Sequence, residues 1–158
     1  MKKLLMLGGF MLALTVSAYS QNSDGYWKRL QKSHPETTLE ALEKNAPAVS
    51  QAPSGEVVLP AFRLSLVFQG QERNVTLENI KLMEKTGLNP ASIRQYRKEL
   101  LFKSADKEVW LPVKSTLIDQ LAIELRKDEQ VLLYTSVLQG REQEEKQVTL
   151  LVEDFQVK

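Results

Sequence analysis

The chain has no cysteine, and its 158 residues include a single histidine, His34. Without cysteine there is no disulfide, no thiol nucleophile and no thiolate ligand for a metal. A metal site or a serine hydrolase triad would depend on His34, which lies in a polar stretch before Pro35, and no G-x-S-x-G motif accompanies it. The sequence also lacks a phosphate-binding loop and a G-x-G-x-x-G motif. We therefore expect no enzyme activity and no cofactor.

The chain has no excess of charge of either sign. It contains 21 basic and 20 acidic residues, with a formal net charge of +1. Removal of a leader that holds Lys2 and Lys3 would leave 19 basic residues and a net charge of −1. The balanced total predicts neither a nucleic acid nor an anionic membrane as the partner.

Only one long apolar run is present, and it lies near the start of the chain. Residues 1–20 have the parts of a secretory signal peptide: a basic start, an apolar run over residues 4–16, and small residues at Ala18 and Ser20. The run is shorter than the roughly 20 residues of a membrane-spanning helix, so we predict cleavage before Gln21, with cleavage after Ala18 as a second possibility and an uncleaved anchor as the alternative. The mature chain is expected to be exported, to the periplasm or the extracellular space, with no stable membrane span.

Residues 21–55 are polar and contain three prolines, which predicts a flexible N-terminal segment. A short helix is possible over residues 36–45, and Tyr26 and Trp27 either dock onto the core or are exposed. The ordered domain is expected over residues 56–158.

The pattern of residues 56–158 predicts an α+β domain that is mainly antiparallel. Alternating apolar positions predict a strand over residues 57–69. A helical period replaces this alternation over residues 76–97, and the remaining strands follow. If the two short helices are an insert after strand 1, the order matches a five-stranded OB-like barrel with a helix between strands 3 and 4, although an α+β sandwich has the same elements. The predicted elements are strands at 57–69, 99–103, 108–113, 131–138 and 148–155, a turn at 70–73, and helices at 76–86, 89–97 and 115–127.

The predicted two-helix insert contains a motif typical of two helices joined by a tight turn. Over residues 85–97, Gly87 follows a helix, Asn89-Pro90 begins the next one, and an Ile-Arg-x-Tyr sequence ends at Tyr96. This stretch resembles the DNA-binding helices of MerR-type regulators. The resemblance implies a helix-turn-helix over residues 77–97 in which Arg94, Arg97 and Lys98 meet phosphates and Ser92 meets a base edge. The same residues also serve any tight helix–helix turn, and the leader and the charge balance favour that interpretation, with no nucleic-acid partner.

Two strand aromatics and three basic residues are the candidate ligand-binding residues. OB-folds use exposed aromatics and the loops between strands to hold ligands. Trp110 and Tyr134 lie on predicted strands, and both could equally belong to the core. The loops at 104–107 and 141–147 add charged residues. The candidates are Trp110, Tyr134, Lys103, Lys107 and Arg141.

We therefore expect an exported, non-catalytic binding or accessory module of the cell envelope or extracellular space, whose ligand is a protein or a glycan. One alternative is a hydrolase that uses carboxylates alone, with Glu144-Glu145 and Glu153-Asp154 as the acidic pairs. Such an enzyme needs two acids facing each other across a cleft, about 5–10 Å apart. The other alternative is the helix-turn-helix DNA-binding protein.

Overall fold

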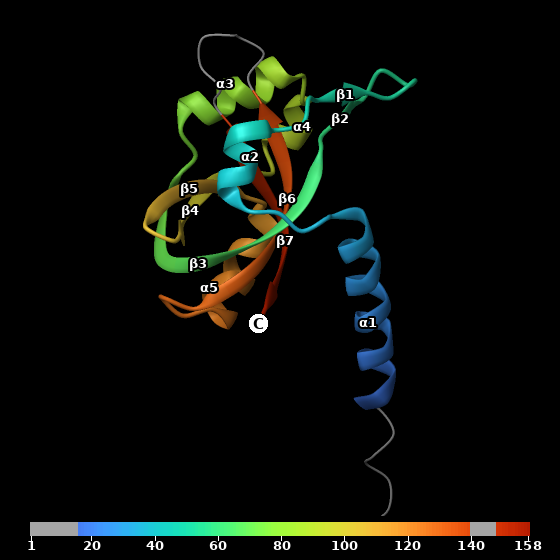
Figure 1. The fold of residues 1–158 in the computed structure, drawn as a ribbon, viewed down its shortest axis with the longest axis vertical. Helices are drawn as coiled ribbons and strands as arrows, with labels where there is room; N and C mark the ends of the chain where they lie inside the picture. Colours follow the sequence, from blue (N-terminus) through green and yellow to red (C-terminus); the bar gives the residue numbers. More distant parts are fainter. Residues whose placement is uncertain (1–15, 140–147) are drawn as a thin grey trace, which may run out of the picture.

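The computed structural model describes the backbone of residues 16–139 and 148–158 (Figure 1). Most of the predicted signal peptide, residues 1–15, lies outside this part of the chain, and α1 includes the predicted cleavage position. No helix among the described residues is long and apolar enough to cross a membrane. The elements are α1 (Val16–Ser33), α2 (Leu39–Asn45), β1 (Ser50–Gln51), β2 (Val57–Val58), β3 (Ala61–Asn74), α3 (Leu77–Thr86), α4 (Pro90–Ile93), β4 (Lys98–Ser104), β5 (Lys107–Val113), η1 (Ser115–Leu117), α5 (Ile118–Glu124), β6 (Gln130–Gln139) and β7 (Val148–Val157).

Five strands form a closed barrel in the order β3-β4-β5-β7-β6. All neighbours are antiparallel except β5 and β7, which are parallel. Helix α5 lies between the third and fourth barrel strands, and α3 and α4 lie between the first and second. The predicted OB-like barrel, with its helix position and its two-helix insert, is therefore confirmed.

Strand β3 pairs with two different neighbours along its length. Ala61–Val67 pairs with β6, and the stretch from Val67 to Asn74 pairs with β4, with a register shift between Phe68 and Glu72. Gly70 lies in this bulge with a positive φ of 69°, a conformation that glycine adopts without a steric penalty. The turn predicted at residues 70–73 is therefore wrong, because the glycine bends a continuous strand instead of ending it.

The barrel interior is filled by alternate residues of the strands and by leucines from two helices. Leu64 and Leu66 of β3 are each 1% exposed, as the period-two pattern predicts. Leu121 of α5 and Leu125, the residue that follows this helix, also belong to the core, and their spacing of four is the one that puts apolar residues on one side of the predicted helix at 115–127. The buried residues of this core are Leu39, Leu42, Leu64, Leu66, Phe68, Leu100, Phe102, Leu111, Val113, Leu121, Leu125, Val131, Leu133, Val137, Leu150, Val152 and Phe155.

The barrel core also receives residues from the segment for which the sequence predicts flexibility. Leu39 and Leu42 of α2 are 3% and 2% exposed. Just before α2, the amide of Thr37 donates to Arg63 O at 3.0 Å, and the amide of Arg63 donates to Pro35 O at 3.1 Å. These bonds occupy the edge of β3 that faces away from β6, so the segment covers backbone groups that would otherwise need water.

The two-helix insert packs on the outside of the barrel. The predicted ends are confirmed: Thr76 accepts from the amide of Asn79, Gly87 ends α3 with a φ of 96°, and Asn89 accepts from the amide of Ser92. The helical period of residues 77–86 also predicts that Leu77 faces inward, and this is wrong, because Leu77 is 73% exposed. A second cluster joins the insert to β6 and β7 through Leu82, Met83, Tyr96, Leu138 and Leu151.

The start of α5 also differs from the prediction. A hydroxyl at Ser115 or Thr116 is the cap that the sequence predicts. Neither residue caps α5, because a turn of 3-10 helix over Ser115–Leu117 comes first. The hydroxyl of Ser115 donates instead to Gln95 O at 2.7 Å, which links this turn to the chain that follows α4.

The barrel closes most weakly between β5 and β7. Their ladder has a single register pair, Val113 with Val152, next to one bond from Lys114 N to Val152 O of 3.1 Å. The β6–β7 ladder, by contrast, has nine pairs.

Substitution of Gly87 by alanine is expected to destabilise the fold by roughly 1–2 kcal/mol, the cost of a left-handed conformation for an L-residue. The new Cβ would also lie 3.0 Å from Val57 Cγ2. Gly25→Ala is the matched control, because nothing lies within 4 Å of a Cβ there and alanine favours the helix. Urea unfolding measures both variants; equal stabilities for the two would contradict this account of Gly87.

Candidate functional site

A half-buried tryptophan lies on the outer face of the β4–β5 hairpin. Trp110 is directly opposite Leu101, and Lys103 is opposite Glu108. These pairs point outward because Leu100 and Leu111, the pair next to them, are in the core. The guanidinium of Arg73 lies 4.3 Å above the Trp110 ring, within cation–π distance. We call Arg73, Leu101, Lys103, Glu108 and Trp110 the Trp110 face.

Arg73 is held over the ring by a buried carboxylate. Glu99 has no exposed surface, and its Oε2 accepts from Arg73 Nε at 2.6 Å. Its Oε1 accepts from the amide and hydroxyl of Thr76 at 3.1 and 3.3 Å, and from Asn79 Nδ2 at 2.6 Å. A buried carboxylate is tolerated only when it is paired and hydrogen-bonded, and this one has four donors.

The same network anchors the start of α3 to the barrel. Thr76 caps α3, and the positive end of the helix dipole lies next to Glu99. Asn79 extends the hydrogen-bond network to β7, because its Oδ1 accepts from the hydroxyl of Thr149 at 3.0 Å. The Trp110 face is thus fixed from β3, β4, α3 and β7 together.

The structure brings together only some of the predicted ligand-binding residues. Trp110 and Lys103 share the Trp110 face. Lys107 begins β5 and forms an ion pair with Glu43 of α2, and Ser104 donates to Glu40 of the same helix at 3.0 Å. Tyr134 is on β6 and fully buried. Arg141, with the whole of the predicted loop at 141–147, lies outside the described residues.

Tyr134 is covered by the end of α1. Its ring is stacked by Trp27, with ring centroids 5.6 Å apart and an angle of 28°, and is met edge-on by His34 at 5.4 Å. Tyr26 donates to the Asp154 carboxylate on β7. Arg63 Nη1 donates to Gln31 O at 2.8 Å and to His34 O at 3.1 Å. Tyr26 and Trp27 therefore dock onto the barrel, and Tyr134 serves as their support.

Three tyrosines have raised pKa values because of these contacts. The hydrogen bond to Asp154 raises the pKa of Tyr26 to about 12. Burial raises the pKa of Tyr134. Burial also raises the pKa of Tyr96, and its donation to Glu153 at 2.6 Å adds to the effect. Neutral phenols at these positions are hydrogen-bond donors to fixed acceptors.

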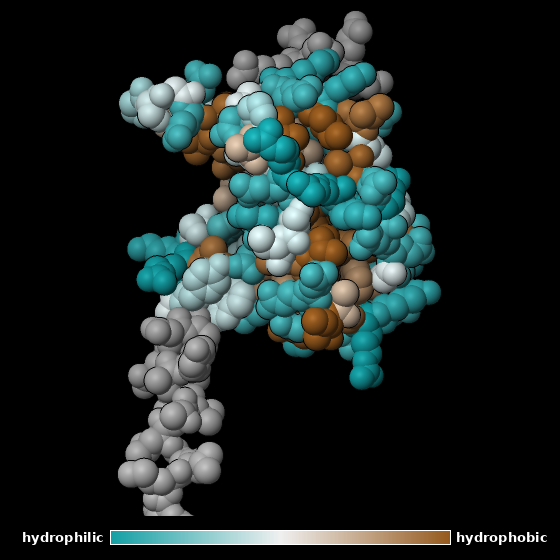
Figure 2. Space-filling model, turned by 180° about the vertical axis from the view of Figure 1, so that it is seen from behind, coloured by the Kyte–Doolittle hydropathy of each residue, from teal (hydrophilic) through white to brown (hydrophobic). Residues whose placement is uncertain are grey.

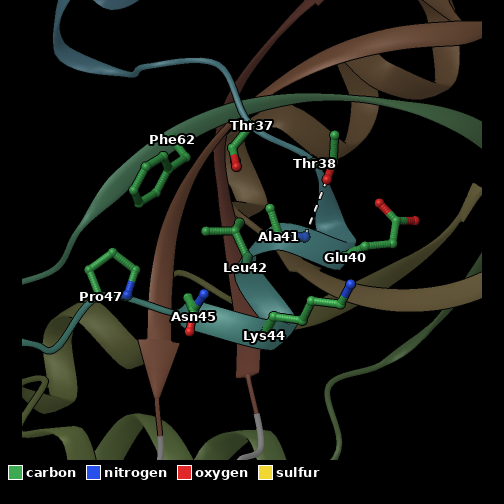
Figure 3. A pocket seen from close by; sticks show the side chains of 9 residues that line it. All are labelled: Thr37, Thr38, Glu40, Ala41, Leu42, Lys44, Asn45, Pro47 and Phe62. Atoms are coloured by element: carbon green, nitrogen blue, oxygen red, sulfur yellow. Dashed lines mark hydrogen bonds between the residues drawn. The ribbon is translucent and has the colours of Figure 1, made fainter.

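A hollow lies between α2 and the first half of β3 (Figure 3). Phe62, Pro47 and Leu42 supply apolar surface, and Thr37, Thr38 and Asn45 supply polar groups. Glu40 is the single carboxylate in its lining, and its pKa is lowered by its own backbone amide and by the Ser104 hydroxyl. Within the described part of the chain, the lining of this hollow holds no second acid opposite Glu40, which a carboxylate hydrolase would need.

The acidic pair Glu153-Asp154, proposed from the sequence for a carboxylate hydrolase, is held by hydrogen bonds and an ion pair to neighbouring side chains. Glu153 accepts from Tyr96 at 2.6 Å and from Lys114 Nζ at 3.4 Å, and Asp154 accepts from Tyr26. In the described ranges no three histidine or acidic side chains gather as a metal site would require. The pair Glu144-Glu145 lies outside them.

Sequence reasoning missed the two residues that position Trp110. Arg73 fell in a predicted turn, and Glu99 was assigned only to a strand. The available signal was a charged residue at position 99 directly before the apolar stretch 100–102. Glu99 lies next to the core residue Leu100 on β4 and points to the outside of the barrel. It is buried because α3 covers the outside of the strand at this point.

No protein-family model matches this chain, and a search among curated proteins finds no relative. The arrangement around Trp110 is therefore interpreted from its own geometry.

Glu99→Gln is expected to lower the free energy of unfolding by about 2 kcal/mol or more, because it removes a buried charge that accepts from four donors. Glu72→Gln is the control: Glu72 pairs with Lys98 at 2.9 Å with both side chains well exposed, so a change of at most about 0.5 kcal/mol is expected. Denaturant unfolding of the two variants compares them, and a loss as small for Glu99 as for Glu72 would refute the role of the network.

The docking of α1 is expected to weaken at high pH. The pKa of Tyr26 is about 12 against an ordinary 10.0, so the docked state holds the proton more tightly. Its contribution is complete below pH 10 and is lost as the pH rises towards 12. The ultraviolet titration of wild type minus Tyr26→Phe should show one phenol that ionises near pH 12, and Asp154→Asn should move it towards 10. A midpoint near 10 in the wild type would contradict the hydrogen bond.

Proposed function

We propose that the chain is an exported, non-catalytic binding module of the cell envelope or extracellular space, which holds a protein or glycan ligand on the Trp110 face. The observation that carries this proposal is the pair of Arg73 and Trp110, held on the outside of the barrel by Glu99. A half-buried tryptophan with a fixed arginine above it offers a ligand a preformed surface that is both apolar and cationic.

Composition and position both support this surface. Tryptophan and arginine are the residue types that most often dominate protein–protein contacts. The outer face of the second and third strands is also the surface with which OB-folds hold extended ligands, oligosaccharides included. Arg73 already occupies one face of the indole. A ligand therefore meets the ring edge, the arginine and Lys103.

The rival functions find less support in the described residues. The helix that would read DNA, α4, has only one turn, and Tyr96 of the motif is buried with its hydroxyl on Glu153. The motif thus packs the insert against the barrel, as a tight helix–helix turn does.

The test is a photo-reactive amino acid introduced at Lys103 in cells that produce the chain. We expect a covalent adduct to a protein, or retention of a glycan, that is lost when Trp110→Ala is added. The matched control places the same group at Lys127, an exposed residue after α5. Equal adducts from both positions, or adducts that persist in Trp110→Ala, would refute the Trp110 face as the binding surface.

A further inference from the structure

Over residues 24–33, helix α1 has an apolar side and a basic side, and its docking decides which one faces water. Tyr26, Trp27 and Leu30 face the barrel or are partly covered. Each basic residue of this stretch comes two positions after one of them, at Lys28, Arg29 and Lys32. Two positions turn an α-helix by about 200°. The three basic side chains therefore lie on the side opposite the barrel, and all three are exposed.

None of these three side chains forms an ion pair with a described residue, and the acidic residue of the described part of α1 is Asp24, one turn before Lys28. The ion pairs found among residues 24–139 and 148–158 involve neither Lys28 nor Arg29 nor Lys32. The nearby Arg63 is bound to Glu36 and to carbonyl groups at the end of α1. Figure 2 shows hydrophilic residues projecting at the left, on the side where α1 lies. The balanced total charge thus conceals a local basic face.

We propose that this basic face of α1 (Lys28, Arg29 and Lys32) binds the anionic headgroups of a lipid bilayer. Two observations favour a bilayer as the occupant. The face is positive and has free ammonium and guanidinium groups, which suit headgroup phosphates. In the sequence, the basic residues at 28, 29 and 32 also follow the apolar run over residues 4–16. Before any cleavage, that run brings α1 to a membrane surface.

The mode of binding follows from what the barrel already covers. An interfacial helix normally inserts its apolar side into the bilayer, but here the aromatic side is docked on Tyr134 and Asp154. Only the electrostatic part of the attraction is left, so binding is reversible and sensitive to salt. The inference is independent of the Trp110 face, which lies on other strands.

The chain, as recovered from producing cells, is sedimented with vesicles of phosphatidylglycerol and phosphatidylcholine in equal parts, and with vesicles of phosphatidylcholine alone. The readout is the partition coefficient for the anionic vesicles divided by that for the phosphatidylcholine vesicles. Any insertion of residues 4–16 contributes to both coefficients, so it cancels in this ratio. We expect a ratio well above one at low salt that falls at high salt. The triple variant Lys28→Gln, Arg29→Gln, Lys32→Gln should lower it on the order of a hundredfold, or to one.

The matched control removes the same charge elsewhere, with Lys81→Gln, Arg94→Gln and Arg97→Gln on the exposed side of the insert. This variant should keep the wild-type ratio. A ratio near one for the wild type, or an equal fall in both triple variants, would overturn the proposal. Unfolding midpoints equal to the wild type in both variants confirm that the substitutions leave the fold intact.

Discussion

The buried carboxylate of Glu99 is the constraint on which the outer part of this structure depends. A charge without exposed surface must be satisfied completely, and its four donors come from β3, from the cap of α3 and from within α3. Satisfying it sets the position of the insert on the barrel and the place of Arg73 above Trp110. The apolar cluster of Leu82, Met83 and Tyr96 stabilises the insert, but apolar contact is not directional. The polar network supplies the orientation.

Much of the fold could be predicted from local patterns. The alternation in β3 and the helical period of α5 are visible in the sequence because each element has one buried side. The cap at Asn89 and the left-handed glycine at position 87 were equally readable, since both depend on neighbouring residues only. The bend at Gly70 was not. A glycine with positive φ suits a turn and a bulge alike, and the choice depends on β4 and β6, which lie far along the chain.

The candidate site was harder to predict than the fold, for a related reason. Trp110 and Tyr134 are alike in the sequence, as aromatics on apolar strands, yet one meets Arg73 and the other is covered by Trp27 and His34. What separates them is which distant segment lies on each strand. The contribution of Leu39 and Leu42 was hidden in the same way, because two leucines in a polar segment are too weak a pattern to indicate a core contact. Long-range packing decides these cases.

The uneven closure of the barrel determines where the folded protein opens locally. The β5–β7 seam has one register pair, whereas β6 and β7 share nine. Local opening follows the route that loses the fewest hydrogen bonds, so amide protons near Val113 and Val152 should exchange with solvent through small fluctuations, while those between β6 and β7 exchange only when the whole domain opens. The barrel is closed in its geometry, but it opens most easily between β5 and β7, where the fewest hydrogen bonds must break.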